Sequence, residues 1–513
     1  MKARILATLG AAMALAPYAV AWKPTTHVLL ADIAYADAAD DGKVTLMRLN
    51  KTTGEATKLG DYEVEPALLA ALQKSRAQYR AGVLGPDAFP DIATGQSAIH
   101  PGDDPKTGGT EGNDPGEGSD AWLKYLYRTS RGESPQVQAW VAGFMTHAAG
   151  DLFAHTFVNH YAGGEFEPGT NAARHIVLES YIGKRAVDVA DYDASIDGVE
   201  KYIAKNLCHM KPDSELSKLL VGPGAEKSPP AFFANLRKDL TDEIAAYDRR
   251  SPAQQASYNV SYPGRIQYLR AWVKDIDRGL DAWPGFSMRL ASHLMFNPKG
   301  MDKPAADAEV KAFMDDYLLS MLGLPDAAGQ VRKFAEALSL ALLTKPQRDA
   351  IAQMEKDFLN QVCTEAFGIS YDDFVQMVKN PETSFDDTLG PKSKGSPTAH
   401  NITLKDFNHL VLELDDDGYS KPDLRWDWQK FPPAYNTVML TKISFLAPAE
   451  VNRVLIDLGA PVDWQLKPGA HVLFDFHNSL DDDNQWHVNS GKLIFERAGV
   501  YEHLFKTQIG ERR

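Results

Sequence analysis

One short stretch of the sequence carries two histidines and an aspartate at a regular spacing. His147, Asp151 and His155 follow one another at intervals of four residues. On a helix, positions i, i+4 and i+8 drift by only about 40° per step, so the three side chains project from one stripe. Two imidazoles and a carboxylate are a ligand set that suits zinc. Because such groups are costly to bury among apolar neighbours, the spacing favours a metal site over a core helix with hydrogen-bonded histidines.

Further nitrogen and oxygen donors flank this stretch. Asp87 and Asp91 lie in a segment that glycine and proline keep irregular, and such loops can place carboxylates at the rim of a site. An aspartate that only shapes a turn is the alternative for either residue. His100 follows them along the chain. Further on, His175 and Glu179 are four residues apart, which places them on one face of a predicted helix.

The first 21 residues have the features of a secretory signal peptide. These are a charged start (Lys2 and Arg4), an apolar centre (Ile5 to Ala16) and a small-residue cleavage motif (Ala19 to Ala21). Cleavage would make Trp22 the new N-terminus, and its exposed α-amine could then bind a metal beside His27. The apolar centre and all later segments are too short to span a bilayer. We therefore expect a secreted or periplasmic protein without a transmembrane segment.

Composition limits the class of protein. The chain has 513 residues, of which 44% are hydrophobic and 24% charged, and its formal net charge is -15. These proportions are ordinary for a globular protein. The acidic balance disfavours non-specific binding to nucleic-acid backbones, so no stable nucleic-acid partner is expected. The two cysteines, Cys208 and Cys363, either pair in an oxidising compartment or remain as buried thiols.

The spacing of apolar residues predicts a mainly α protein. The helix that carries the His147 stretch is expected over 136–153, ending near Thr156. Other expected helices cover 28–39, 66–80, 120–131, 214–380 and 437–458; strands are expected over 402–414, 471–476 and 492–495, and a small hairpin over 42–65. A segment rich in glycine, proline, lysine and serine at 390–398 predicts a linker. It divides a helical domain, 22–389, from a smaller mixed α/β domain, 395–513.

The C-terminal region has two features of its own. Its four tryptophans are compatible with docking at a lipid surface, although buried tryptophans are the commoner case; they are Trp426, Trp428, Trp464 and Trp486. Two runs of three aspartates could bind Ca²⁺ or form solvated turns; they are Asp415 to Asp417 and Asp481 to Asp483.

Taken in order along the chain, the candidate ligands resemble those of a known family. The order is tryptophan at the mature N-terminus, an early histidine, a Pro-Asp loop, histidine, His-x-x-x-Asp, histidine and His-x-x-x-Glu. This order is similar to that of the zinc-dependent bacterial phospholipases C, whose helical, trinuclear fold is shared by the single-strand-specific zinc nucleases. The resemblance covers residues 22 to 180. It implies an all-helical domain that holds three Zn²⁺ ions.

The resemblance also implies three ligand sets. The first ion would be held by Asp87, His100, His147 and Asp151. The second would be held by the amine and carbonyl of Trp22, by His27 and by a bridging Asp151. The third would be held by His155, His175 and Glu179, with water completing its shell.

Two positions in this pattern have competitors. In several family members the histidine after the bridging aspartate lies further along the chain, so His160 competes with His155. On a continuous helix His160 would point about 220° away from His147, which favours His155 unless the helix breaks near Thr156. Asp91 likewise competes with Asp87.

The implied activity is phospholipid hydrolysis at a membrane or micelle surface. Zinc would supply hydroxide to attack the phosphodiester, Asp87 would orient or deprotonate the water, and the products would be diacylglycerol and a phosphorylated head group. The short gap from Trp22 to His27 resembles the nucleases, whereas Glu179 resembles the phospholipases. A zinc nuclease or nucleotidase is therefore one alternative, and a non-enzymatic zinc-binding exported protein is another.

Overall fold

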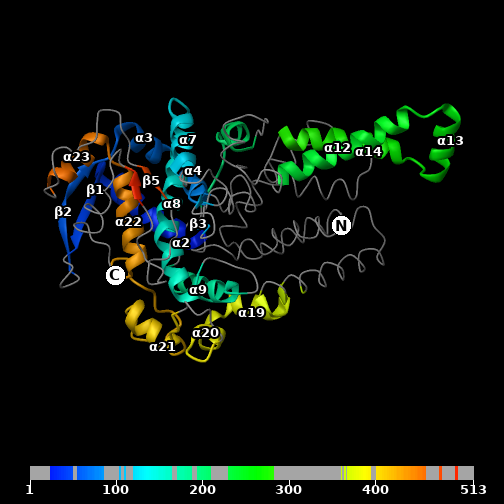
Figure 1. Ribbon diagram of the computed structural model, residues 1–513. Helices are drawn as coiled ribbons and strands as arrows, with labels where there is room; N and C mark the ends of the chain where they lie inside the picture. Colours follow the sequence, from blue (N-terminus) through cyan, green and yellow to red (C-terminus); the bar gives the residue numbers. More distant parts are fainter. Residues whose placement is uncertain are drawn as a thin grey trace.

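The computed structural model of the chain shows a mainly helical protein, as the sequence predicts (Figure 1). It describes residues 24–49, 55–85, 103–104, 109–110, 120–164, 170–187, 193–208, 229–281, 360, 363–364, 367–393, 400–457, 473–475 and 492–494. Within these ranges, none of the helices has the length and apolarity that crossing a bilayer requires.

Helix α8, Pro135–Ala162, is the central element and carries the His147 stretch. It begins at Ser134, whose hydroxyl accepts a hydrogen bond from the amide of Val137, and it ends at Gly163, which takes the left-handed conformation with φ 88°. The predicted end near Thr156 is therefore wrong. The helix continues because Val158 is fully buried in the core, and this tertiary packing outweighs the lower helix propensity of β-branched residues.

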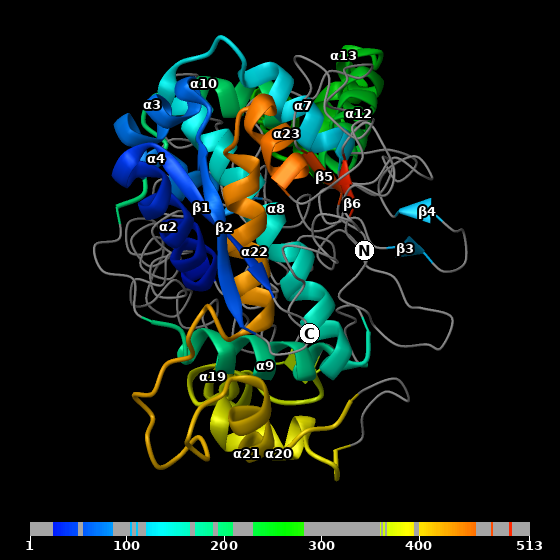
Figure 2. The same cartoon turned by 90° about the vertical axis from the view of Figure 1, so that its left-hand side faces the viewer.

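Six helices pack around α8 or against its neighbours (Figures 1 and 2). They are α2 (Pro24–Asp41), α3 (Pro66–Lys74), α4 (Arg76–Gly82), α7 (Asp120–Ser130), α9 (Ala172–Lys184) and α22 (Pro432–Ser444). Their buried apolar side chains form one continuous core. Helix α8 therefore lies in the middle of this core, and four of its polar residues are buried there: Thr146, His147, Asp151 and Asn159.

The strands form two-stranded antiparallel sheets. The largest pairs β1 (Lys43–Leu49) with β2 (Ala56–Glu63), as the sequence predicts for this region. The others are β3 (Asp103–Asp104) with β4 (Gly109–Thr110), and β5 (Leu473–Asp475) with β6 (Lys492–Ile494). The last pair falls within the two strands that the sequence predicts near the C-terminus.

The C-terminal segment 400–457 shares the core of the N-terminal elements. Helix α22 packs on α8, α2 and β1, and the amide of Glu65 donates a hydrogen bond to the carbonyl of Phe445 at 2.9 Å. Helix α23, Pro448–Asp457, follows α22 after a short break. Residues before and after the predicted linker therefore contribute to one core. Residues 394–399 of the linker region lie outside the described residues.

The strand predicted over 402–414 is wrong. Residues Leu404–Asp406 form the helical turn α21, and Phe407–Val411 form the π-helical turn η4. The hydroxyl of Thr403 accepts a hydrogen bond from the amide of Asp406 at 3.1 Å and so caps this helical turn. Local capping and the burial of Leu404 and Phe407 therefore outweigh the partial alternation in the sequence.

Two features of the C-terminal region have structural roles. Trp426 is 2% exposed and its indole N–H donates to the carbonyl of Ile182, so this side chain is not available to a lipid surface. Asp416 is buried against the guanidinium of Arg185 at 2.6 Å. Asp417 accepts hydrogen bonds from two backbone amides, which is the geometry of a turn. Trp464, Trp486 and the second aspartate run lie outside the described residues.

Seven further helical elements belong to the described part of the chain. They are α10 (Glu200–Ile203), η2 (Ala204–Cys208), α19 (Tyr371–Lys379), α20 (Pro381–Leu389), α12 (Pro229–Asp248), α13 (Pro252–Ser261) and α14 (Arg265–Asp281). Cys363 is a buried free cysteine in the structure. Burial raises the pKa of the Cys363 thiol to about 11, so this thiol stays protonated at neutral pH.

Candidate metal centre

Close packing between α4 and α8 sets the position of the His147 stretch. A Cβ atom on Gly82 would lie 1.9 Å from the carbonyl oxygen of Trp140, and one on Gly143 would lie 2.0 Å from the carbonyl oxygen of Tyr79. Both distances are far below any real contact, so only glycine lets the two backbones approach this closely. The contact brings the C-terminal end of α4 next to His147.

His147 is held by a backbone group at the end of α4. Its Nδ1 lies 2.8 Å from the carbonyl oxygen of Val83. Because a carbonyl only accepts, Nδ1 must carry the proton, which leaves the lone pair on Nε2. That Nε2 atom faces Asp151 Oδ2 at 2.8 Å. A hydrogen bond of this kind fixes the tautomer and ring orientation of histidines that bind metals.

Gly85 leaves room for the His147 ring. It has a positive φ of 47°, and a Cβ atom there would lie 2.5 Å from His147 Cγ. Both the conformation and the space therefore require glycine. The sequence identifies Gly82 and Gly85 only as residues that break regular structure, because a close approach between segments distant in sequence leaves no local signal.

His27 enters the site from α2, a helix that lies more than a hundred residues earlier in the chain. Its Nε2 is 3.2 Å from Asp151 Oδ1. Its ring stacks on that of His147, with centroids 4.1 Å apart and planes at 15°. His27, His147 and Asp151 are 2%, 0% and 2% exposed. The Asp151 carboxylate thus lies between two imidazoles, one facing each oxygen.

The donor set fits a metal ion. The three ligand atoms all lie within 4.8 Å of one another. Two ligand atoms on one tetrahedral zinc are about 3.3 Å apart, given zinc–ligand bonds near 2.0 to 2.1 Å. The His–Asp separations of 2.8 and 3.2 Å are close to that value. Across the described part of the chain, this is the one group of three His, Cys, Asp or Glu donors that comes so close together.

His155 lies on the same face of α8 as the centre. Its Nε2 is 3.8 Å from Asp151 Oδ1, and its side chain is 13% exposed. His160 is directed elsewhere, because its ring stacks on that of His400 with centroids 3.8 Å apart. Since α8 is continuous through residue 162, the condition that would have favoured His160 as the ligand is not met.

The second predicted pair lies on α9. His175 Nδ1 is 3.5 Å from Glu179 Oε1, and His175 Nε2 is 2.7 Å from the carbonyl oxygen of Gly164. This carbonyl selects the tautomer of His175 as Val83 selects that of His147. Burial lowers the pKa of His175 to about 4, so its ring is neutral at neutral pH. A neutral imidazole with a fixed tautomer is the form that binds metals.

The other predicted ligands lie outside the described residues. They are Trp22, Asp87, its competitor Asp91, and His100. The structure therefore brings together His27, His147 and Asp151, adds His155 beside them, and keeps His175 with Glu179. The backbone carbonyls of Val83 and Gly164 are site residues that the sequence did not reveal, because any residue type carries this group.

Comparisons with known proteins identify no relative of this chain. No family model, no curated protein and no solved structure matches it.

His155 and His160 provide a matched test of which histidine completes the centre. We expect His155→Ala to lower the metal content by about one ion per chain, because the third predicted ligand set would lose one of its three side chains. His160→Ala removes the same side chain from the same helix and should leave metal content unchanged. The measurement is elemental analysis of the purified chain. Loss of metal in the His160 variant alone would reverse the assignment.

Proposed function

We propose that the chain is an exported, zinc-dependent phosphodiester hydrolase of the phospholipase C type. The observation that carries the proposal is the buried Asp151 carboxylate, which has the Nε2 atoms of His27 and His147 on its two oxygens. These three residues are the ones that the ordered sequence pattern assigns to neighbouring ions with a shared carboxylate. The pattern assigns nine ligands, and the geometry brings these three of them together.

The proposal assigns three zinc ions to the full set of nine predicted ligands. His27, His147 and Asp151 would hold the first two with Trp22, Asp87 and His100, and the third would take His155, His175 and Glu179. When bound, zinc lowers the pKa of a coordinated water toward neutrality and polarises a phosphoryl oxygen.

The chain's own residues prepare the site for this chemistry. The carbonyls of Val83 and Gly164 accept hydrogen bonds from His147 Nδ1 and His175 Nε2. The other nitrogen of each ring is thereby left unprotonated and able to bind a metal. Burial keeps His175 neutral, so zinc does not have to displace a proton from it near pH 7. The continuous helix α8 fixes Asp151 and His155 on a rigid element, which preserves the spacing between ligands during turnover.

A substrate comparison tests the proposal. The mature chain, starting at Trp22, would be assayed on a short-chain phosphatidylcholine dissolved as monomers and on a single-stranded DNA oligomer, with and without prior chelation. We expect release of phosphocholine that is lost on chelation and restored by Zn²⁺. Cleavage of DNA alone would indicate a nuclease on the same metal centre. Zinc binding without hydrolysis of either substrate would indicate a non-enzymatic zinc protein.

A further inference from the structure

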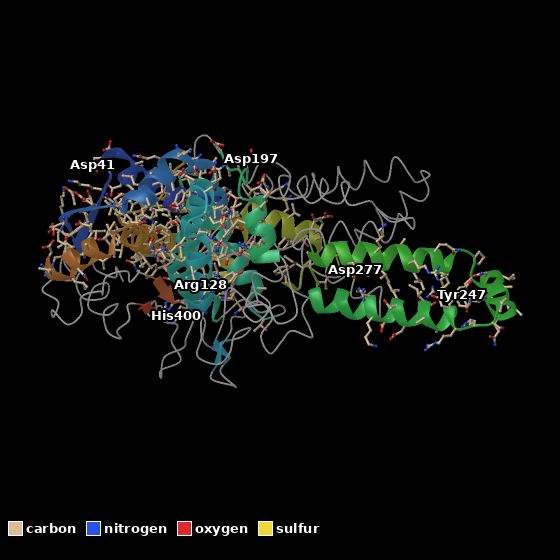
Figure 3. The ribbon with its side chains drawn as sticks, turned by 90° about the horizontal axis from the view of Figure 1, so that it is seen from above. Asp41, Arg128, Asp197, Tyr247, Asp277 and His400 are labelled. Atoms are coloured by element: carbon tan, nitrogen blue, oxygen red, sulfur yellow. The ribbon has the colours of Figure 1, made fainter. Side chains whose placement is uncertain are left out.

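Helices α12, α13 and α14 form an arm that projects from the other described helices (Figures 1 and 3). Helices α12 and α14 pack against each other along their length. Helix α13, Pro252–Ser261, crosses between them at the far end. In Figure 3, Asp277 lies near the base of the arm and Tyr247 lies near its far end.

The arm has its own apolar seam. Ile266, Leu269 and Ile276 on α14 are buried, as is Leu240 on α12. The partly buried Val273 lies between them on α14, and the resulting spacing of three and four residues is that of a helix pair. The seam holds α12 and α14 together as one unit.

Ion pairs link the two helices along their flanks. Arg237 pairs with Asp277, Arg265 with Glu243 at 2.6 Å, and Arg270 with Asp248 at 2.7 Å. Each pair joins α14 to α12. These three ion pairs therefore add inter-helix contacts to the apolar seam.

The end of the arm exposes apolar side chains. Val260 is 82% exposed and Tyr262 is 54% exposed. Helix α13 has no buried residue at all. It is nevertheless a defined helix, because Ser251 and Gln254 form a reciprocal capping box at its start. We call residues 249–265 the tip.

The tip is cationic in an acidic protein. Residues 249 to 270 contain four arginines and no aspartate or glutamate, whereas the whole chain has a formal net charge of -15. Glu243 and Asp248 on α12 neutralise two of the four arginines, those at 265 and 270. Arg249 and Arg250 are both exposed and supply the excess positive charge. The Arg250 guanidinium lies over the Tyr258 ring, 4.6 Å from its centroid, and the Tyr258 and Tyr262 ring centroids are 5.0 Å apart.

We propose that the tip docks on the surface of anionic phospholipid membranes. Arginines attract anionic head groups, and an exposed valine and tyrosine can enter the interface below them. The proposal rests on the proposed function, because docking there would bring the enzyme to its substrate. A nucleic-acid site would need aromatic side chains that offer ring faces along a basic groove. At the tip the aliphatic Val260 is more exposed than Tyr262, and Arg250 covers the ring of Tyr258, which favours lipid over stacked bases.

Vesicle binding by the full chain tests the docking. The vesicles would contain phosphatidylcholine with about 30 mol % phosphatidylserine, and bound protein would be measured by flotation. We expect the double variant Arg249→Gln, Arg250→Gln to bind about 25-fold more weakly, at about fivefold for each cation. The variant Val260→Ser should also bind several-fold more weakly. Omitting phosphatidylserine should weaken binding of the unaltered chain by a similar factor.

A matched control removes the same charge elsewhere. Lys74 and Lys379 are exposed residues of the body, and the double variant Lys74→Gln, Lys379→Gln should bind vesicles within about twofold of the unaltered chain. Equal loss in both double variants would overturn the proposal, because net charge alone would then explain it. Unchanged binding in the tip variants would also overturn it. Tip-dependent binding of a single-stranded DNA oligomer without vesicle binding would assign the tip to nucleic acid instead.

The activity of the tip variants separates this proposal from the proposed function. We expect them to keep full activity on monomeric short-chain phosphatidylcholine and to lose activity on vesicles in proportion to binding. If neither the unaltered chain nor the variants hydrolyse the monomeric substrate, the proposed function fails. Tip-dependent vesicle binding would still support the docking in that case.

Discussion

Replacing Asp151 with asparagine is expected to remove the metal centre while keeping the fold. Asparagine has the same shape, but its neutral amide is a much weaker metal ligand than a carboxylate. Its NH₂ group can donate to the Nε2 of His27 or His147, which now face the two carboxylate oxygens. We therefore expect the metal-free variant to unfold at nearly the same denaturant concentration as the metal-free parent.

The expected functional loss is large. The kcat/KM for phosphodiester hydrolysis should fall by at least about 10³-fold, because metal ions stabilise the charge that develops in the transition state by several kcal/mol. Zinc should raise the melting temperature less than it does in the parent, since the ions that share Asp151 would no longer bind the folded state. The measurements are metal content, thermal melts with and without Zn²⁺, and initial rates on the monomeric substrate.

Asp197→Asn is the matched control for Asp151→Asn. Asp197 is exposed at a turn and is not one of the candidate ligands. The same chemical change there should leave metal content and rate unaltered. Full metal content and activity in the Asp151 variant would exclude this residue, and with it the proposed centre.

The sequence predicts elements of the fold where the pattern is local. The apolar spacing predicts a start at 136, one residue after the observed start of α8 at Pro135, and the spacing of His147 and Asp151 places both on one face of that helix. The end of α8 was predicted wrongly, because Phe157 and Val158 are held by the core and by Phe431, which lies far along the chain. The residues around position 156 do not include Phe431, so their local pattern cannot predict this contact.

The same limit applies to the site. The spacing of the residues on α8 indicates a metal ligand set, but it cannot show that His27 stacks on His147. The family resemblance assigned His27 to the centre, and the structure places it beside Asp151. The resemblance did not reveal Gly85, because a glycine required by an approaching side chain looks the same in sequence as a glycine required by a turn.

Gly85→Ala should therefore disturb the centre without touching any ligand. The new methyl group would lie 2.5 Å from His147 Cγ, so the ring or the segment 83–85 must move. Either movement breaks the hydrogen bond from His147 Nδ1 to Val83. Loss of such an outer contact typically weakens metal affinity by about 10- to 100-fold. We expect that loss in competition with a zinc chelator, together with a stability decrease of about 1–3 kcal/mol.

Gly132→Ala separates the crowding effect from backbone strain. Gly132 also has a positive φ, 82°, but a Cβ atom there would meet nothing within 4 Å. The variant should lose about 1 kcal/mol of stability in guanidinium unfolding, from the left-handed conformation alone, and should keep its zinc affinity. If both variants bind zinc as tightly as the parent, the Val83 carbonyl does not orient His147 for a metal. If both lose affinity equally, the effect arises from general destabilisation rather than from the space that Gly85 leaves beside the ring.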